Sequence, residues 1–221
     1  NKKFIDLRPL IKLDSMKATM KTLSAILICC FISTIQMYGE NIQRPESENY
    51  VKGVEALNEG NPEAAYTYLN AEINEHPDNG YAHCYMALIC NFCNDTKLAL
   101  KALNSSLELI PEADTEYRSF AHYSRGVLLT NLKMWEHAEA DLNEAIRLNP
   151  EDVENYKSRA QLYFETERYE ESLDDLTRAL KLDSKADVND LVLQLMAVAP
   201  TSEFMERITA TYQQLDQVTI H

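Results

Sequence analysis

Three of the five cysteines and two histidines are the residues best suited to chemistry in this chain of 221 residues. Cys90 and Cys93 have the two-residue spacing of a redox dithiol, and Cys84 and His83 lie a few positions before them. With His122 they form a candidate metal site, because thiolates and imidazoles are common ligands of zinc. The alternative is that the thiols are small apolar residues of a core.

The predicted position of the cysteine pair favours the core. Cys90 and Cys93 fall late in a predicted helix, whereas a redox cysteine needs a helix N-terminus to stabilise its thiolate. The sequence has no glycine-rich phosphate loop, no nucleophile elbow and no paired histidines with zinc spacing. We therefore expect no catalytic residue, no metal and no cofactor, and a thiol-handling or metal-handling protein is a minor alternative.

Acidic residues are the second group that could do chemistry. Nine of them lie on two predicted helices, at Glu136, Glu139, Asp141, Glu144, Glu167, Glu170, Glu171, Asp174 and Asp175. Paired carboxylates catalyse proton transfer only in a cleft, and apolar residues already define the buried face of these helices. We expect the carboxylates on solvated outer faces. The formal charge of −14 argues against nucleic acid and anionic membranes as partners.

A period of 34 residues organises the helices that carry these groups. Arg125-Gly126, Trp135, Ala138, Leu142, Ala145 and Leu148 recur 34 positions later as Arg159-Ala160, Tyr169, Ser172, Leu176, Ala179 and Leu182. A fixed period of this length is typical of a solenoid. Helical spacing of the apolar residues breaks at residues 131–134 and resumes until Pro150, so each copy is predicted to be a helical hairpin.

The residue types within one copy suggest how the hairpin packs. Gly126 and Ala138 are small enough to let the two helices approach closely, and Pro150 ends the second helix. Trp135 and Tyr169 are expected to fill the base of the hairpin. In these features the chain resembles the tetratricopeptide repeat family. The resemblance implies an all-α fold, a right-handed superhelical solenoid of helix-turn-helix repeats, and a protein-interaction scaffold that is not an enzyme.

Four copies are predicted, approximately at residues 46–79, 80–113, 119–152 and 153–186. The residues that define them are Gly53, Ala65, Ala87, Ala99, Gly126, Trp135, Ala138, Ala160, Tyr169 and Ala179. In the first copy the last small residue is expected at Ala71, because Glu72 stands where a small residue belongs. Five additional residues before the third copy indicate a longer connection or an extra helical turn. Ser184 replaces proline in the fourth copy, whose second helix is expected to run on.

The resemblance also implies where a partner binds. In arrays of this family the first helices line a concave groove that holds an extended peptide or a partner helix. The residues carried onto that groove are Tyr50, Tyr81, Cys84, Asn91, Tyr123, Thr130, Lys157 and Gln161. Family members that capture acidic tails use several cations there, whereas this lining has one, so a partly apolar peptide fits better. The alternative for each tyrosine is that it fills a gap between copies.

Residues 187–221 are predicted to form a capping helical hairpin or a degenerate fifth repeat. Apolar residues from 188 to 199 form one helical face, and Thr201-Ser202 is a start signal for a second helix. An array needs such a cap because its last apolar face would otherwise be exposed. Self-association through this hairpin, or the opening of a longer array, is the alternative.

Residues 1–39 lie outside the repeats and are predicted to hold upstream residues and a signal peptide. Two lysines precede an apolar run at residues 23–35. This run is shorter than the roughly 20 residues of a membrane span, so no stable span is expected in the mature form. Translation is expected to start near Met16 or Met20, with a linker at residues 40–45. The predicted location is the bacterial periplasm or cell surface, and the alternative is a membrane anchor formed by this segment.

The function predicted from the sequence is therefore the binding of a partner peptide or helix in the groove of an exported bacterial scaffold. The sequence does not identify that partner. A second possibility is that the chain is the helical interaction or regulatory part of a larger enzyme or transport assembly.

Overall fold

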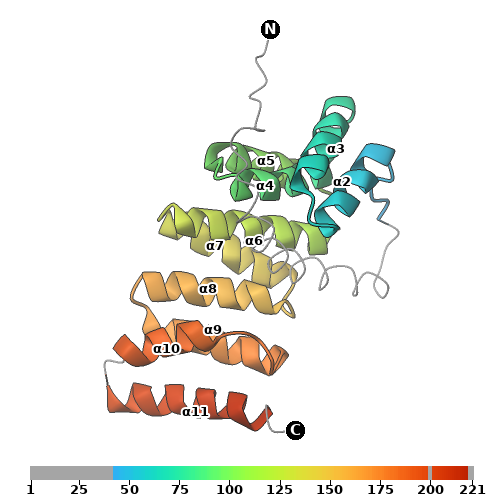
Figure 1. Ribbon diagram of the computed structural model, residues 1–221. Coiled ribbons are helices and arrows are strands. Elements are labelled where there is room, and N and C mark those ends of the chain that lie inside the picture. The colour runs from blue at the N-terminus through green and yellow to red at the C-terminus, as the bar shows by residue number, and fades with distance from the viewer. Residues whose placement is uncertain (1–41, 199–200, 219–221) are drawn as a thin grey trace. The chain divides into compact units, whose positions relative to one another are not determined.

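The computed structural model describes residues 42–198 and 201–218, which form helices joined by short turns (Figure 1). The helices are α2 (Glu48–Asn58), α3 (Pro62–Glu75), α4 (Gly80–Phe92), α5 (Thr96–Leu109), α6 (Thr115–Asn131), α7 (Trp135–Leu148), α8 (Val153–Glu165), α9 (Tyr169–Leu182), α10 (Asn189–Val198) and α11 (Ser202–Val218). The chain divides into two compact units, the first ending at Asp114 and the second beginning at Thr115. The predicted signal peptide in residues 1–39 lies outside the described residues.

Helices α2 to α9 form four successive hairpins. Two hairpins belong to the first unit, and the other two belong to the second unit together with α10 and α11. No strand occurs in the described ranges, so the all-α fold predicted from the sequence is confirmed. None of the described helices is both long and apolar enough to cross a membrane.

The turn inside each hairpin has the same geometry in all four copies. One residue of each turn has a positive φ, with values of 70° at Gly60, 59° at Asn94, 59° at Lys133 and 60° at Glu167. The next residue closes the turn through its amide, as when Met134 N donates to Leu129 O at 2.9 Å. Glycine adopts this left-handed conformation at the lowest cost, so the other three turns have a less favourable residue at the same position.

The two helices of a hairpin approach most closely at a small residue. A Cβ atom placed on Gly126 would lie 2.7 Å from Leu142 Cγ and 3.3 Å from the carbonyl oxygen of Ala138. Gly53 has the same restriction in the first hairpin, whereas the fourth has Ala160, which is fully buried. The small residues therefore set the distance between the paired helices.

Tyrosines fill much of the space between α2 and α4 in the first unit. The ring centroid of Tyr50 lies 6.5 Å from that of Tyr81 and 6.1 Å from that of Tyr85. The Tyr81 hydroxyl donates to Asp114 Oδ2 at 2.9 Å, and Arg44 donates to both oxygens of the same carboxylate at 3.0 and 3.1 Å. Arg44 thus ties the segment before α2 to the end of this unit.

The last small position of the first hairpin holds Glu72, and the prediction that it shifts to Ala71 is wrong. Glu72 is only 1% exposed, and its equivalents in the later hairpins are buried serine and alanine residues. Its Oε1 atom accepts a hydrogen bond of 2.7 Å from Asn79 Nδ2, while Oε2 has no hydrogen-bond partner among the described residues. A carboxylate is tolerated here because a buried amide supplies a donor.

The two irregularities noted in the sequence have different outcomes. Helix α6 has 17 residues against 13 in α4 and α8, so the additional residues before the third copy form an extra helical turn. The prediction that α9 runs on past its usual end is wrong. It ends at Leu182, in register with Leu148 of α7, because Asp183 Oδ1 accepts a hydrogen bond of 2.8 Å from the amide of Lys185 and turns the chain.

Helices α10 and α11 cover the apolar face of α8 and α9 in the second unit. Phe204 and Ile208 of α11 are 1% and 0% exposed in the core that they share with α8 to α10. Arg207 bonds to Glu170 of α9 and donates to Asp174 Oδ1 at 2.7 Å. Figure 1 shows α11 beside α9 and α10 at the end of this unit.

Candidate functional site

A pocket of about 190 Å³ lies in the second unit between α8, α9 and the start of α10. It is lined by Lys157, Gln161, Leu176, Asp187, Val188, Asp190, Leu191 and Gln194. Lys157 and Gln161 are two of the groove residues predicted from the sequence, one helical turn apart on α8. Most of the other lining residues come from the segment that enters α10, which the sequence assigned to the cap.

The size of the pocket limits what it can hold. Sites for whole small molecules and cofactors usually enclose about 300–1,000 Å³. A volume of about 190 Å³ is below that range and suits one inserted side chain better. The pocket is therefore more suitable as an anchor point for a protein partner than as a cofactor site.

The pocket combines an apolar floor with a polar rim. Leu176, Val188 and Leu191 are 1%, 3% and 8% exposed, so they form the packed part of the lining. At the rim, Lys157 Nζ donates to Glu154 Oε1 at 2.8 Å. This ion pair balances the charge of the lysine.

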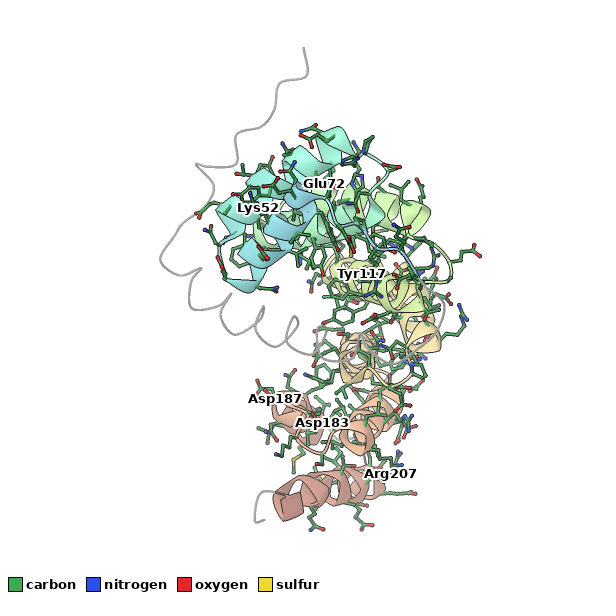
Figure 2. The ribbon with its side chains drawn as sticks, turned by 90° about the vertical axis from the view of Figure 1, so that its right-hand side faces the viewer. Lys52, Glu72, Tyr117, Asp183, Asp187 and Arg207 are labelled. Carbon is green, nitrogen blue, oxygen red and sulfur yellow. The ribbon has the colours of Figure 1, made fainter. Side chains whose placement is uncertain are left out.

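The negative charges of two carboxylates at the rim are not balanced by an ion pair among the described residues. Asp187 and Asp190 are exposed, and neither has an ion pair or hydrogen-bond partner within the part of the chain that the structure describes. Figure 2 shows Asp187 at the surface of the second unit. The N-terminus of α10 contributes about half a positive charge, which is less than the two negative charges beside it. The rim is therefore negative at neutral pH.

Four other predicted groove residues are used within the fold. Tyr50, Tyr81 and Cys84 are 7%, 5% and 0% exposed, so their side chains present little surface to a partner. Thr130 is also buried, and its hydroxyl donates to the carbonyl oxygen of Gly126 at 2.9 Å. These positions fit the alternative that residues of the first helices fill gaps between copies.

The last two predicted groove residues differ from each other. Asn91 is exposed near the end of α4, and its role in partner binding stays a prediction. Tyr123 is half-buried on α6, and its hydroxyl forms a hydrogen bond with Ser158 of α8. Burial and the neighbouring Glu154 raise the pKa of the Tyr123 hydroxyl above its usual range. The role of Tyr123 in partner binding stays a prediction.

Comparison with known proteins identifies the repeat. The profile of the family described as "Tetratricopeptide repeat" matches residues 121–152 and 154–185, which are the third and fourth hairpins. The chain contains tetratricopeptide repeats. The all-α arrangement of its hairpins agrees with that fold, and proteins of this kind are generally scaffolds for protein–protein interaction.

Curated relatives and a solved structure share the repeat. Tetratricopeptide repeat protein 6 of Homo sapiens is 24% identical over 143 residues, which are 65% of this chain and 26% of that protein. The lipoprotein NlpI homolog of Haemophilus influenzae is 31% identical over 87 residues, which are 39% of this chain and 28% of that protein. The structure of MamA from Desulfovibrio magneticus RS-1 aligns with a TM-score of 0.62 and 19% identity, covering 77% of this chain and 94% of that one. The chain thus spans between a quarter and a third of each curated relative.

The third and fourth tetratricopeptide repeats contain two buried carboxylates that the sequence had placed on the solvated face. Asp141 and Asp175 are 6% and 5% exposed, so the prediction is wrong for these two residues. Arg125 donates to both oxygens of Asp141 at 2.7 and 2.8 Å, and Arg159 does the same to Asp175 at 2.8 and 2.7 Å. The arginine and the aspartate are 16 positions apart in both repeats, and this spacing was the available sequence signal.

The two aspartates have opposite pKa shifts. Burial raises the pKa of Asp141, but hydrogen bonds from Arg125 and His122 outweigh it, so the pKa lies below the ordinary value. The His122 Nδ1 atom is 2.9 Å from Asp141 Oδ1. For Asp175 burial is the stronger effect, and Arg159 offsets only part of it, so the pKa is raised. Two neighbours contribute to the difference: His122 lowers the pKa of Asp141 in the third repeat, and the charge of Asp174 raises the pKa of Asp175 in the fourth.

The cysteines of the second repeat do not have the surroundings of a reactive site. Burial raises the pKa of the Cys84 and Cys90 thiols to about 12, and it raises the pKa of Cys93 as well. A reactive thiol requires the opposite shift. The described residues contain no group of three or more His, Cys, Asp or Glu side chains placed to hold a metal. His83 instead contacts the carbonyl oxygen of Pro77 at 3.0 Å through Nε2.

Proposed function

We propose that this protein with tetratricopeptide repeats is a non-enzymatic scaffold that binds a peptide or helix of a partner protein at the pocket between α8 and α10. The observation that carries the proposal is the meeting of Lys157 and Gln161 with the start of α10 around one cavity of about 190 Å³. Both residues are also predicted from the sequence to line the partner-binding groove.

The shape and chemistry of the pocket support binding by one anchoring side chain. Protein interfaces gain most of their affinity where a side chain enters a pocket that excludes water, with polar groups around it. Here Leu176 and Val188 supply the apolar floor, and Gln161 and Gln194 supply amides at the rim. Such amides can bond to the partner backbone on either side of the anchor.

The same proposal includes an extracytoplasmic location. The predicted signal peptide in residues 1–39 supports export, and the similarity to a protein named as a lipoprotein homolog supports an association with the bacterial envelope. In this setting the partner is an envelope protein. Cell fractionation of the tagged full chain tests the location, and a signal confined to the cytoplasmic fraction would contradict it.

Capture of partners by the full chain tests the binding site. The pocket variant is Gln161→Ala/Gln194→Ala, and the control is Gln213→Ala, which changes an exposed glutamine of α11 in the same unit. We expect at least one envelope protein to be retained by the unchanged chain and by the control but lost by the pocket variant. Circular dichroism should give the same helicity for all three chains. Identical sets of captured proteins would contradict the proposal.

A further inference from the structure

We infer that the pocket between α8 and α10 selects the cationic side chain of a lysine or arginine, so the partner presents a basic segment. This inference rests on the proposed function and specifies the chemistry of the anchoring residue. This specificity is the opposite of that of family members that capture acidic tails, because those members supply several free cations. The pocket has one cation, Lys157, and its ammonium group is already 2.8 Å from Glu154 Oε1.

The charges at the rim favour a cationic side chain over an acidic or an apolar one. Asp187 and Asp190 lie on the same rim, and no ion pair to either is found in the described part of the chain. An acidic side chain entering here would bring a third negative charge close to them. An apolar side chain would remove water from the carboxylates without replacing its hydrogen bonds. A cation supplies both the charge and the donors that these groups lack.

The apolar floor suits the rest of a lysine or arginine side chain. Leu176, Val188 and Leu191 line the pocket but are only 1%, 3% and 8% exposed, so the aliphatic surface that they present is small. Lysine and arginine have an aliphatic stem of three or four methylene groups that packs on such a surface while the charged end stays at the rim. An apolar floor below an acidic rim therefore matches the two ends of one cationic side chain.

The charge of the whole second unit acts in the same direction. Residues 115–221 contain 20 acidic and 11 basic residues, which gives a net charge of −9. A negative field attracts basic segments during diffusion and repels acidic ones, and salt weakens this effect. The local rim charges then determine where the basic segment is bound.

A phage-displayed library of random 12-residue peptides tests the inference with the full chain as bait. Peptides that bind the unchanged chain are counter-selected against the pocket variant Gln161→Ala/Gln194→Ala, so that only pocket-dependent binders remain. We expect these peptides to share a lysine or arginine at one fixed position. Pocket-dependent peptides that share an apolar or acidic residue instead would overturn the inference and leave the proposed function intact. A complete lack of pocket-dependent peptides would contradict the proposed function itself.

Variants of the rim then test the role of the two carboxylates. Asp187→Asn/Asp190→Asn should weaken a selected lysine peptide about tenfold in an anisotropy titration, because two partly exposed charge pairs are removed together. The matched control is Glu203→Gln/Glu206→Gln, which removes two exposed carboxylates with the same spacing from α11. The control should change the affinity less than twofold. Equal losses in both variants would show a general charge effect and overturn the assignment of the rim.

Discussion

Each hairpin has an equivalent pair of positions that are 16 residues apart, one on each helix. The two units have different types of residue at these positions. In the second unit these positions hold Arg125 with Asp141 and Arg159 with Asp175, and both pairs are joined by two hydrogen bonds. Arg159 additionally donates to Asn143 Oδ1 at 2.6 Å, so this pair connects three helices. The second unit thus places charged groups where its helices meet.

The first unit uses apolar and aromatic contacts at the same positions. Met86 and Ala102 are both 6% exposed in its second hairpin. In its first hairpin the Lys52 ammonium lies 5.7 Å from the centroid of the Tyr68 ring. A repeat can therefore tolerate several pairings here, but only the ionic ones require both partners, because a single buried charge is costly.

The two units also differ in how the N-termini of their second helices are capped. Asn61 and Asp95 cap the second helices of the first unit, accepting hydrogen bonds of 3.1 and 3.0 Å from the amides of Ala64 and Leu98. At the equivalent positions of the second unit, Met134 and Arg168 form no side-chain cap. At these equivalent positions the second unit has ion pairs, whereas the first has capping hydrogen bonds and packing.

Removing an arginine should give the largest difference between the units. Arg159→Ala leaves Asp175 buried without its partner and should destabilise the second unit by about 3–5 kcal/mol. Lys52→Ala removes an exposed contact with the Tyr68 ring and an exposed ion pair with Glu48, so it should destabilise the first unit much less. Urea denaturation, with hydrogen exchange to assign the loss to α2–α3 or α8–α9, measures both effects. Similar costs for the two variants would contradict the contrast.

The pH dependence of stability should distinguish the third repeat from the fourth. The pKa of Asp141 is lowered by folding, so its contribution is present above the ordinary value of 3.8 and is lost as the pH falls through the folded-state pKa. The pKa of Asp175 is raised, so its protonation favours folding at low pH, and this contribution is lost as the pH rises through the folded-state pKa.

Variants of the two aspartates should therefore change the pH profile in opposite directions. Between about pH 3 and 5, Asp141→Asn should make the free energy of unfolding fall less steeply on acidification, whereas Asp175→Asn should make it fall more steeply. Urea titrations of both variants across this range measure the two slopes. Each variant serves as the control for the other. Slopes that change in the same direction would contradict the assigned pKa shifts.

An N-cap residue like those of the first unit should stabilise the second unit when it is introduced there. This effect should be smaller than the loss caused by removing Arg159. Met134 has φ and ψ of −90° and 63°, close to the −85° and 71° of Asp95, so the backbone already has the capping conformation. Met134→Asn should add a hydrogen bond to the start of α7 and stabilise the unit by about 1 kcal/mol. Met134 is 42% exposed, so little packing is lost. The control Met134→Ala should give no gain, and an equal gain from it would rule out capping as the cause.

The sequence predicted the hairpins because their determinants are periodic and local. Gly126 permits a close helix approach, and Thr201 supplies a start signal whose hydroxyl accepts a hydrogen bond of 3.1 Å from the amide of Phe204. The burial of Asp141 was not predicted, because a helical period assigns charged residues to the outer face unless a partner on another helix is known. Glu72 was misplaced for a similar reason, since its donor Asn79 lies beyond the end of its helix.

The candidate site could be predicted only in part. Lys157 and Gln161 followed from the position of the first helix in a repeat. Asp187 and Asp190 precede or begin a helix that departs from the repeat pattern, so no periodicity connected them to α8. Tyr50 and Tyr81 were assigned to the groove, yet side chains of the first helices also pack between copies, and the sequence does not separate these two roles.

Photo-crosslinking in living cells tests the binding site most directly. A photoreactive p-benzoylphenylalanine replaces Gln161 at the pocket or, as the control, Gln213 on α11, and the full chain is irradiated in its native host. We expect a specific crosslinked partner from position 161, absent from position 213 and reduced by Asp187→Asn/Asp190→Asn. The absence of any crosslink from position 161, or the same crosslink from both positions, would contradict the pocket as the partner-binding site.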